Sequence, residues 1–277
     1  MSPLAAQLRA RIETEGPISV EAWMNACLAD PDHGYYMTRD PLGRAGDFTT
    51  APEISQMFGE LLGLWAGVVW QHIGGPSKVH LIEIGPGRGT LMKDTLRALR
   101  GVPGVMDALD VHMVETSPTL TKAQQNSLKD TPCNVTWHTD LATVPQGPVI
   151  FLANEFLDAL PIRQYIRSDG GWYERVVTLS GDQFVFGLGE RVDDSVIPEK
   201  FRAASDGSIY EDAPIVQVAV QNIAHRIASD GGAALIVDYG YAENVLGETL
   251  QALSKHAYAD PLDCPGENDL TAHVNFA

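Results

Sequence analysis

The chain has 277 residues, of which 44% are hydrophobic and 20% are charged, so it can bury the core of a globular protein. Its formal net charge of −17 argues against nucleic acid as a partner, because such binding depends on Lys and Arg contacts to phosphates. An acidic surface tolerates a basic substrate, such as a peptide that contains arginine, and a merely solvated face is the alternative interpretation of this charge. Three widely separated cysteines form no C-x-x-C pair, which predicts reduced thiols and no metal site.

The sequence predicts neither a targeting segment nor a membrane segment. The first twenty residues lack the apolar core of a signal peptide, and Glu13 and Glu15 are untypical of a transit peptide. No stretch approaches the roughly 18 consecutive apolar residues that a membrane span needs. We therefore expect a cytoplasmic protein.

Helical periodicity predicts a helical N-terminal part that covers residues 1–75. An apolar stripe indicates its first helix and consists of Leu4, Leu8 and Ile12. A second short helix is expected over Val20–Ala29. The polar, glycine-containing stretch from Arg39 to Thr50 predicts a loop.

A longer helix is expected to close this N-terminal part. Thr50-x-x-Glu53 is the pattern of a capping box, and Pro52 suits the first turn of a helix. The helix is expected to end at Gly74-Gly75. Its predicted buried face consists of Ile54, Met57, Phe58, Leu61, Leu62, Trp65, Val68 and Val69.

From residue 76 onward, short apolar strands alternate with helices, which predicts a parallel sheet covered on both faces. The expected strands are Val79–Ile84, Val111–Val114, Val135–Trp137, Val149–Ala153 and Ala233–Val237, and the expected helices are Thr90–Arg100, one from Pro118, and Pro214–Ser229. An antiparallel meander is inserted at about residues 162–212, with strands Arg163–Arg167, Trp172–Leu179 and Gln183–Phe186. The predicted fold is α/β, with a Rossmann-like domain over residues 76–277.

The run from Ile82 to Thr90 joins the first strand to a helix through three glycines, Gly85, Gly87 and Gly89. Glycines at such a turn let backbone N–H groups and the start of the helix approach a ligand closely. The dinucleotide fingerprint is G-x-G-x-x-G, whereas the third glycine here comes one residue early. That spacing, with Glu83 before it, resembles the first motif of S-adenosylmethionine methyltransferases. A donor site is predicted on Glu83 and the three glycines, and tight packing alone is the alternative.

Polar positions near later strand ends extend this predicted site. Glu115 ends the second strand, where a carboxylate can accept both ribose hydroxyls of an adenosine. Ser117 follows it, and its position also suits the cap of the next helix. Asp140 and Leu141 come shortly after the third strand, where such folds bind adenine. A merely solvated acid is the alternative interpretation of both Glu115 and Asp140.

Polar side chains also follow the fourth strand directly. Asn154 and Glu155 come straight after the apolar run Val149–Ala153, at the end of the strand where ligands of open α/β sheets bind. Polar groups at this place would be costly without partners or a task. With Phe156 next, the arrangement is similar to the polar-then-aromatic motif of N-methyltransferases. Helix capping is the alternative interpretation.

With these motifs, the chain resembles the MidA family over almost its whole length. The resemblance implies a class I methyltransferase fold and an arginine methyltransferase, dependent on S-adenosylmethionine, that assists the assembly of respiratory complex I in mitochondria and related bacteria. The implied substrate is an arginine of the complex I subunit close to the quinone site. The matching stretches are Gly46–Glu53, Glu83–Met92, Val114–Pro118, Asn154–Pro161, Gly171–Arg175, Asp238–Gly240 and Pro265–Val274.

The implied chemistry is an in-line attack of a guanidinium nitrogen on the methyl group of the sulfonium. Guanidinium is protonated at ordinary pH, so a pair of carboxylates would orient it and accept the proton. Glu155 and Asp158 are the candidates for this pair, with Asn154 aligning the nitrogen. Phe48 and Phe156 either line the donor pocket or pack in the core.

The chain departs from the family in two ways. Asn275 stands where the family has Asp after His-Val, which puts a charge-based role there in doubt. Family members continue further and end the sheet with an antiparallel hairpin, whereas 39 residues follow Asp238 here. One helix is expected around Leu250–His256 and one extended piece around Leu270–Phe276. The chain is therefore expected to be a fragment or to have an incomplete sheet, with an open edge at Ala233–Val237.

Two other functions fit parts of this pattern. A nicotinamide-dependent oxidoreductase would need a third glycine at position 90, which is Thr90. An assembly chaperone that binds S-adenosylmethionine without methylating anything would keep the donor site and lose the chemistry. The preferred prediction is the arginine methyltransferase, with a protein as its substrate.

Overall fold

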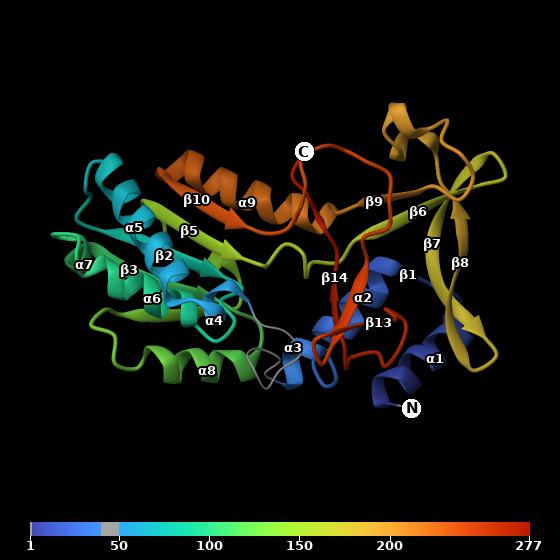
Figure 1. Ribbon diagram of the computed structural model, residues 1–277, viewed down its shortest axis with the longest axis horizontal. Coiled ribbons are helices and arrows are strands. Elements are labelled where there is room, and N and C mark those ends of the chain that lie inside the picture. The colour runs from blue at the N-terminus through green and yellow to red at the C-terminus, as the bar shows by residue number, and fades with distance from the viewer. Residues whose placement is uncertain (1, 40–49) are drawn as a thin grey trace. The chain divides into compact units, whose positions relative to one another are not determined.

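In a computed structural model, which describes residues 2–39 and 50–277, the chain divides into two compact units (Figure 1). The parallel-sheet unit consists of Tyr36–Phe156 and Ala219–Asp238. The meander unit consists of Met1–Tyr35, Leu157–Val218 and Tyr239–Ala277. Each unit is thus assembled from segments far apart in the sequence, and the division at residue 75 stays a prediction about domains.

Part of the predicted pattern lies outside the described residues. This applies to the expected loop from Arg39 to Thr50, apart from its two end residues, and to Phe48 and Gly46–Thr49 of the family motif. Within the described ranges, no helix is both long enough and apolar enough to cross a membrane.

The parallel-sheet unit is built on five strands in the order β10-β5-β2-β3-β4, and every neighbouring pair is parallel. This confirms the predicted α/β fold. The strands are β2 (Val79–Ile84), β3 (Leu109–Val114), β4 (Val135–His138), β5 (Val149–Asn154) and β10 (Gly232–Val237). The helices are α4 (Ala51–Ile54), α5 (Gln56–His72), α6 (Thr90–Leu99), α7 (Val105–Ala108), α8 (Pro118–Leu128) and the short η1 (Leu141–Thr143), together with most of α3 (Tyr35–Thr38) and of α9 (Pro214–Asp230), whose first residues belong to the other unit.

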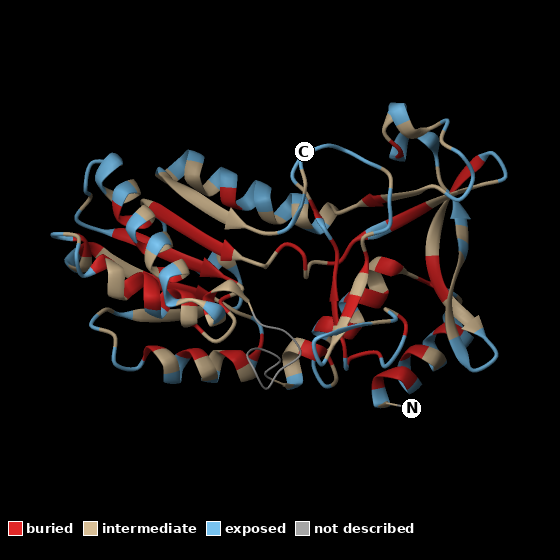
Figure 2. Ribbon diagram, in the orientation of Figure 1, coloured by how far each residue is buried: buried red, intermediate tan, exposed pale blue. Residues whose placement is uncertain are grey.

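Two apolar clusters cover the two faces of this sheet. Leu81 of β2 belongs to the cluster of Met92 from α6, whereas the next residue, Ile82, belongs to the cluster of Ile223 from α9. Because neighbouring residues of a strand point to opposite faces, α6 and α9 cover opposite sides of the sheet. The central strands are buried, as Figure 2 shows, while β10 is partly exposed along its whole length. In the described residues β10 pairs with β5 alone, so the predicted open edge is present.

The meander unit confirms the predicted antiparallel insertion, in which β7 pairs with both β6 and β8. Its strands are β1 (Ile18–Ser19), β6 (Arg163–Ser168), β7 (Gly171–Ser180), β8 (Gln183–Arg191), β9 (Ile209–Asp212), β11 (Gly240–Tyr241), β12 (Gln251–Ser254), β13 (Ala257–Ala259), β14 (Asp269–Thr271) and β15 (Val274–Asn275). Its helices are α1 (Pro3–Glu15), α2 (Val20–Ala29), η2 (Asp194–Val196) and η3 (Glu199–Phe201). The two predicted N-terminal helices are confirmed.

The predicted helix around Leu250–His256 is wrong. This segment forms the hairpin of β12 and β13, and β14 pairs with the other side of β12. The turn consists of Lys255 and His256, whose φ angles of 50° and 62° lie in the left-handed region. A tight hairpin turn normally carries Gly, Asn or Asp at such positions, so this sequence lacks the usual signal.

The predicted single helix after Thr50 is also wrong, because it is two helices, α4 and α5. Ser55 between them is extended, with φ −144°. The expected capping box does not form, since Thr50 makes no side-chain cap hydrogen bond. The carboxylate of Glu53 instead accepts a hydrogen bond from the hydroxyl of Thr90, the first residue of α6. Glu53 thus bonds to a residue far away in the sequence and not to the N-cap of its own helix.

Helix α5 buries its small residues fully, whereas its large residues are partly buried or exposed. The buried residues of this helix are Gly59, Gly63, Ala66 and Gly67. Predicted core residues that are in fact exposed are Ile54 at 73%, Met57 at 63%, Leu61 at 57% and Val68 at 50%. A Cβ on Gly63 would lie 2.6 Å from the carbonyl oxygen of Thr95 in α6, so glycine allows the two helices to approach. The predicted face is therefore only partly right, because Leu62, Trp65 and Val69 pack, partly buried, against the core cluster of α6, whereas Met57, Leu61 and Val68 are exposed.

Replacing Gly63 with valine should destabilise the protein by about 1–3 kcal/mol, because the added carbons overpack the contact with α6. Thermal unfolding followed by circular dichroism measures this. The control is Leu61→Ala on the exposed face of the same helix, which should change stability little. Equal effects of the two substitutions would show that the glycine face is not the packing face.

Candidate functional site

The loop from β2 to α6 bends through three glycines in the left-handed region. Their φ angles are 63° at Gly85, 52° at Gly87 and 78° at Gly89, the N-cap of α6. Glycine adopts these angles without strain. A Cβ on Gly85 would lie 2.8 Å from the ring of Phe156, so there is no room for a side chain. The loop thus presents bare backbone at the start of a helix, as a closely bound ligand requires.

Glu83 precedes this loop on β2 and is only 2% exposed. Burial raises its pKa well above the ordinary value, a backbone hydrogen bond at Met92 opposes the shift, and the charge of Glu115 adds to it. Its Oε2 atom has no hydrogen-bond partner within the described part of the chain. A cationic ligand group, such as the amino group of an amino acid, would satisfy this acceptor.

Glu115 follows β3, and its carboxylate accepts hydrogen bonds from the backbone of Ser117 and Thr116 and from the side chain of Gln124. The backbone N–H of Ser117 donates to its Oε1 at 2.7 Å, and Nε2 of Gln124 donates to its Oε2 at 3.1 Å. Burial raises the pKa of Glu115, and these hydrogen bonds partly offset that effect. The carboxylate is therefore fixed in place at the end of the strand.

Gln124 on α8 is fully buried and connects three elements. Besides Glu115, its Nε2 reaches the carbonyl oxygen of Gly87 at 2.8 Å. Its Oε1 accepts a hydrogen bond from Nε1 of Trp137 on β4 at 3.0 Å. Gln124 was not predicted from the sequence, because one glutamine in an amphipathic helix resembles a surface residue.

The other residues predicted to contact the methyl donor already make contacts within the protein. The hydroxyl of Ser117 caps α8 and donates to the carbonyl oxygen of Tyr36 at 2.6 Å. Asp140 caps η1, and its Oδ1 accepts from the N–H of Ala142 at 2.9 Å. Leu141 packs, partly buried, against the apolar cluster beside α9. Contacts of Ser117, Asp140 and Leu141 with a donor stay predictions.

Asn154 ends β5, and Glu155 is the first residue after it. Glu155 has φ 47°, a left-handed angle that costs a non-glycine residue on the order of 1–3 kcal/mol and is typical of functional sites. Its N–H donates to the carbonyl oxygen of Val237 at 2.9 Å, which anchors the turn to β10. The carboxylate accepts from the backbone N–H of Ala51 and, at 3.4 Å, from Nδ2 of Asn154.

Burial is the main influence on the charge of Glu155. It raises the pKa of the carboxyl, the hydrogen bonds from Ala51 and Asn154 lower it, and the charge of Asp238 raises it. A raised pKa makes the ionised carboxylate a stronger base, as a general base near neutral pH requires. Within the described residues, Oδ1 of Asn154 is buried without a hydrogen-bond partner.

Asp158 belongs to the meander unit, whereas Asn154 and Glu155 belong to the parallel-sheet unit. It is buried, and its side chain hydrogen-bonds to Tyr239, whose pKa is raised by burial and by the charge of Asp158. Its carbonyl oxygen accepts from the N–H of Ala272 at 2.9 Å. The predicted pairing of Glu155 with Asp158 involves residues of both units and stays a prediction.

Comparison with known proteins decides the family. A family of S-adenosyl-L-methionine-dependent methyltransferases matches residues 61–277. The mitochondrial protein arginine methyltransferase NDUFAF7 of Danio rerio is 38% identical, over 98% of this chain and 69% of that protein. Its homolog in Drosophila melanogaster is 39% identical, over 99% and 68%. A Burkholderia thailandensis structure bound to S-adenosyl-homocysteine is 27% identical, with a TM-score of 0.83 over 99% of this chain and 73% of that one.

The chain belongs to this methyltransferase family. The match confirms the resemblance to the MidA family and the Rossmann-like class I fold. The protein is a methyltransferase whose cofactor is S-adenosylmethionine. The glycine loop, the buried acceptor atom of Glu83 and the fixed carboxylate of Glu115 are suited to hold such a donor.

The predicted cytoplasmic location is wrong by this comparison, because the similar NDUFAF7 proteins are named mitochondrial. The prediction used the composition of residues 1–20. That composition does not decide the compartment, since targeting segments are distinct from the residues that build a fold.

Gln124→Leu should weaken the binding of S-adenosyl-homocysteine about tenfold. The substitution removes the side-chain N–H group that both the carbonyl oxygen of Gly87 and the carboxylate of Glu115 accept from. Calorimetric titration with S-adenosyl-homocysteine measures this. The matched control is Gln125→Leu, one residue further on the exposed side of α8, which should leave affinity unchanged. Unaltered affinity in both variants would contradict a role for Gln124 in holding the loop.

Proposed function

We propose that the protein methylates an arginine side chain of a protein substrate, with Glu155 as the group that orients the arginine and takes its proton. Support comes from the similar proteins that are named protein arginine methyltransferases. The observation that carries the proposal is Glu155 itself, a largely buried carboxylate on a left-handed backbone directly after β5. Ligands of open α/β sheets bind at this end of the strands.

The donor, when bound, supplies a methyl group on a positively charged sulfur. In this proposal the glycine loop and Glu83 hold its amino-acid part, and Glu115 accepts its ribose hydroxyls. Ser117, Asp140 and Leu141 border its adenine. The residues that hold the donor thus come from the ends of β2, β3 and β4.

The substrate arginine needs a base, because guanidinium is protonated at ordinary pH. The carboxylate of Glu155 would form charge-assisted hydrogen bonds to it and accept a proton as the nitrogen–carbon bond forms. Oδ1 of Asn154 is a buried acceptor that a guanidinium N–H would satisfy. Asp158 is proposed as the second carboxylate. The net charge of −17 favours the approach of a basic segment.

The finer proposal is that the substrate is the complex I subunit near the quinone site and that methylation assists assembly. It rests on the resemblance to the MidA family. Incubation of that subunit with this protein and labelled donor, followed by mass spectrometry, should find a methylated arginine. Donor binding with no methylated arginine would favour the chaperone without catalytic activity.

We expect the protein to bind S-adenosylmethionine and S-adenosyl-homocysteine and not NAD, because the loop has G-x-G-x-G spacing. Gly87→Val should abolish binding, since φ 52° strains valine and its side chain fills space beside the ligand. Gly247→Val is the control, because a Cβ at Gly247 meets no atom within 4 Å. Calorimetric titration would contradict the prediction if NAD gave heat and the methyl donor did not.

Glu155→Gln should leave donor affinity intact and lower turnover by ~100-fold or more, a typical loss of a general base. Turnover is measured as transfer of labelled methyl to the substrate peptide. Glu243→Gln, at an exposed position, is the matched control and should keep full activity. Full turnover in Glu155→Gln would move the base to Asp158 or away from this motif.

The rate should also fall as pH falls through the raised pKa of Glu155. Above that pKa the carboxylate is ionised and accepts a proton, and below it the protonated form cannot. The midpoint of this acidic limb should lie above 4.5, the ordinary value for glutamate. A pH profile of kcat/KM measures it, and a limb that persists in Glu155→Gln would assign it to another group.

A further inference from the structure

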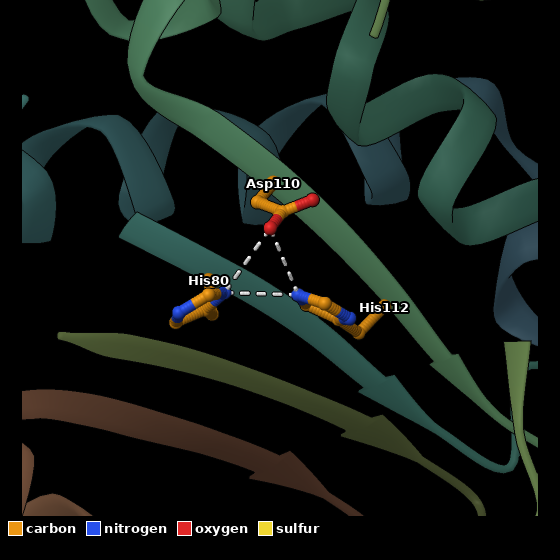
Figure 3. A group of neighbouring side chains, drawn as sticks. All are labelled: His80, Asp110 and His112. Carbon is orange, nitrogen blue, oxygen red and sulfur yellow. Dashed lines mark hydrogen bonds and ion pairs between the residues drawn. The ribbon is translucent and has the colours of Figure 1, made fainter. Parts of the chain in front are cut away.

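Three histidines form a hydrogen-bonded row across neighbouring strands of the parallel sheet. Nδ1 of His80 on β2 lies 2.9 Å from Nε2 of His112 on β3, and Nδ1 of His112 lies 2.9 Å from Nε2 of His138 on β4. His80 and His112 are 1% and 2% exposed. Asp110, the register partner of His80, lies two residues before His112 and thus on the same face. Figure 3 shows His80, Asp110 and His112 facing one another.

The two ends of the row determine where its protons lie. Nε2 of His80 is 3.2 Å from the carbonyl oxygen of Gln146, which can only accept, so a neutral His80 has its proton there and a bare Nδ1. At the other end, the hydroxyl of Thr143 donates to the carbonyl oxygen of Asp140 at 2.7 Å. Nδ1 of His138, 2.8 Å from that hydroxyl oxygen, must therefore donate to it, which leaves Nε2 of His138 bare.

His112 in the middle consequently faces a bare nitrogen on each side. A neutral imidazole has one N–H group and can donate a hydrogen bond to only one of the two neighbouring rings. If His112 donates to His138, then Nε2 of His112 and Nδ1 of His80 face each other without a proton between them. Oδ2 of Asp110 lies 3.6 Å from each of these two nitrogens. Three electron-pair donors then surround one point, and a cation there would satisfy all of them.

The spacing of these atoms fits a transition metal. A triangle with sides of 2.9, 3.6 and 3.6 Å has a circumscribed radius of about 2.0 Å, and zinc binds imidazole nitrogen and carboxylate oxygen at about 2.0–2.2 Å. We propose that His80, His112 and Asp110 form a binding site for a divalent transition-metal ion of the zinc class, held by two imidazole nitrogens and one carboxylate oxygen.

The surrounding hydrogen bonds suit such a site. With an ion between His80 and His112, each neutral ring keeps one proton, and these go to Gln146, His138 and Thr143. Metal-bound histidines usually donate their other N–H in this way. The neutral ring is the form that binds metals.

The position of the site indicates a structural role. His80 and Asp110 are the second residues of β2 and β3, whereas the donor loop follows the last residue of β2. The ion would therefore lie toward the opposite end of the strands from the methyl donor. It would cross-link β2 to β3 and, through His112 and His138, hold β4 in register.

Lys78 offers a sharp test, because its Nζ lies 3.2 Å from Oδ2 of Asp110 and competes with a cation for that oxygen. Its side chain is 64% exposed, so replacing it should not disturb the fold. Lys78→Met should strengthen metal binding several-fold. If Asp110 were merely the partner of Lys78, the same substitution would leave metal binding unchanged.

The experiment titrates Zn²⁺ into the full chain against a chromophoric chelator, with visible absorption of Co²⁺ as a second signal. We expect one tight site, a higher melting temperature with Zn²⁺, and an affinity about tenfold or more lower in Asp110→Asn. His225→Gln, at an exposed histidine of α9, is the control and should bind as the unaltered chain does. Circular dichroism checks that each variant is folded.

Two results would overturn the proposal. One is that the unaltered chain binds neither Zn²⁺ nor Co²⁺ with one-to-one stoichiometry. The other is that folded Asp110→Asn binds as tightly as the unaltered chain, while His225→Gln binds less tightly, which would assign the metal to surface histidines.

Discussion

The side-chain amide of Gln124 is the contact on which the donor end of the sheet depends. Through one buried residue of α8, it connects the loop after β2, the carboxylate after β3 and the indole of β4. Without it, Glu115 and Gly87 would each keep a buried acceptor with one donor fewer. The three glycines determine the conformation of the loop, whereas this amide fixes the position of the loop relative to Glu115.

Most of the parallel sheet could be predicted from the sequence, because each central strand is a short apolar run between turn or helix signals. The prediction failed where tertiary contacts outweigh local pattern. Helix α5 turns its glycines inward because α6 approaches so closely, which no scale of hydrophobicity reports. The hairpin at Lys255 and His256 was missed because its turn residues are unusual for their left-handed angles.

The candidate site could be predicted where glycines and strand ends in the sequence indicate the geometry of the backbone. Gly85, Gly87 and Gly89 give such a signal, and the family match supports the donor they imply. Side chains that come together only through the pairing of two strands give no such signal in the sequence. His80 and His112 are 32 positions apart, and nothing in their spacing indicates that β2 and β3 bring them within 2.9 Å. The pattern of the cysteines alone therefore predicted no metal site.

The backbone angle of Glu155 has a consequence for how this chain balances stability against activity. A glycine at this position would adopt φ 47° without a steric penalty, so Glu155→Gly should relieve local strain on the order of 1–2 kcal/mol in the folded state, although glycine also increases the entropy of the unfolded chain. The hydrogen bonds that the carboxylate accepts from Ala51 and Asn154 offset part of this strain. The left-handed backbone of Glu155 is thus a local cost of folding, and the proposed role of its carboxylate would give a reason to keep it.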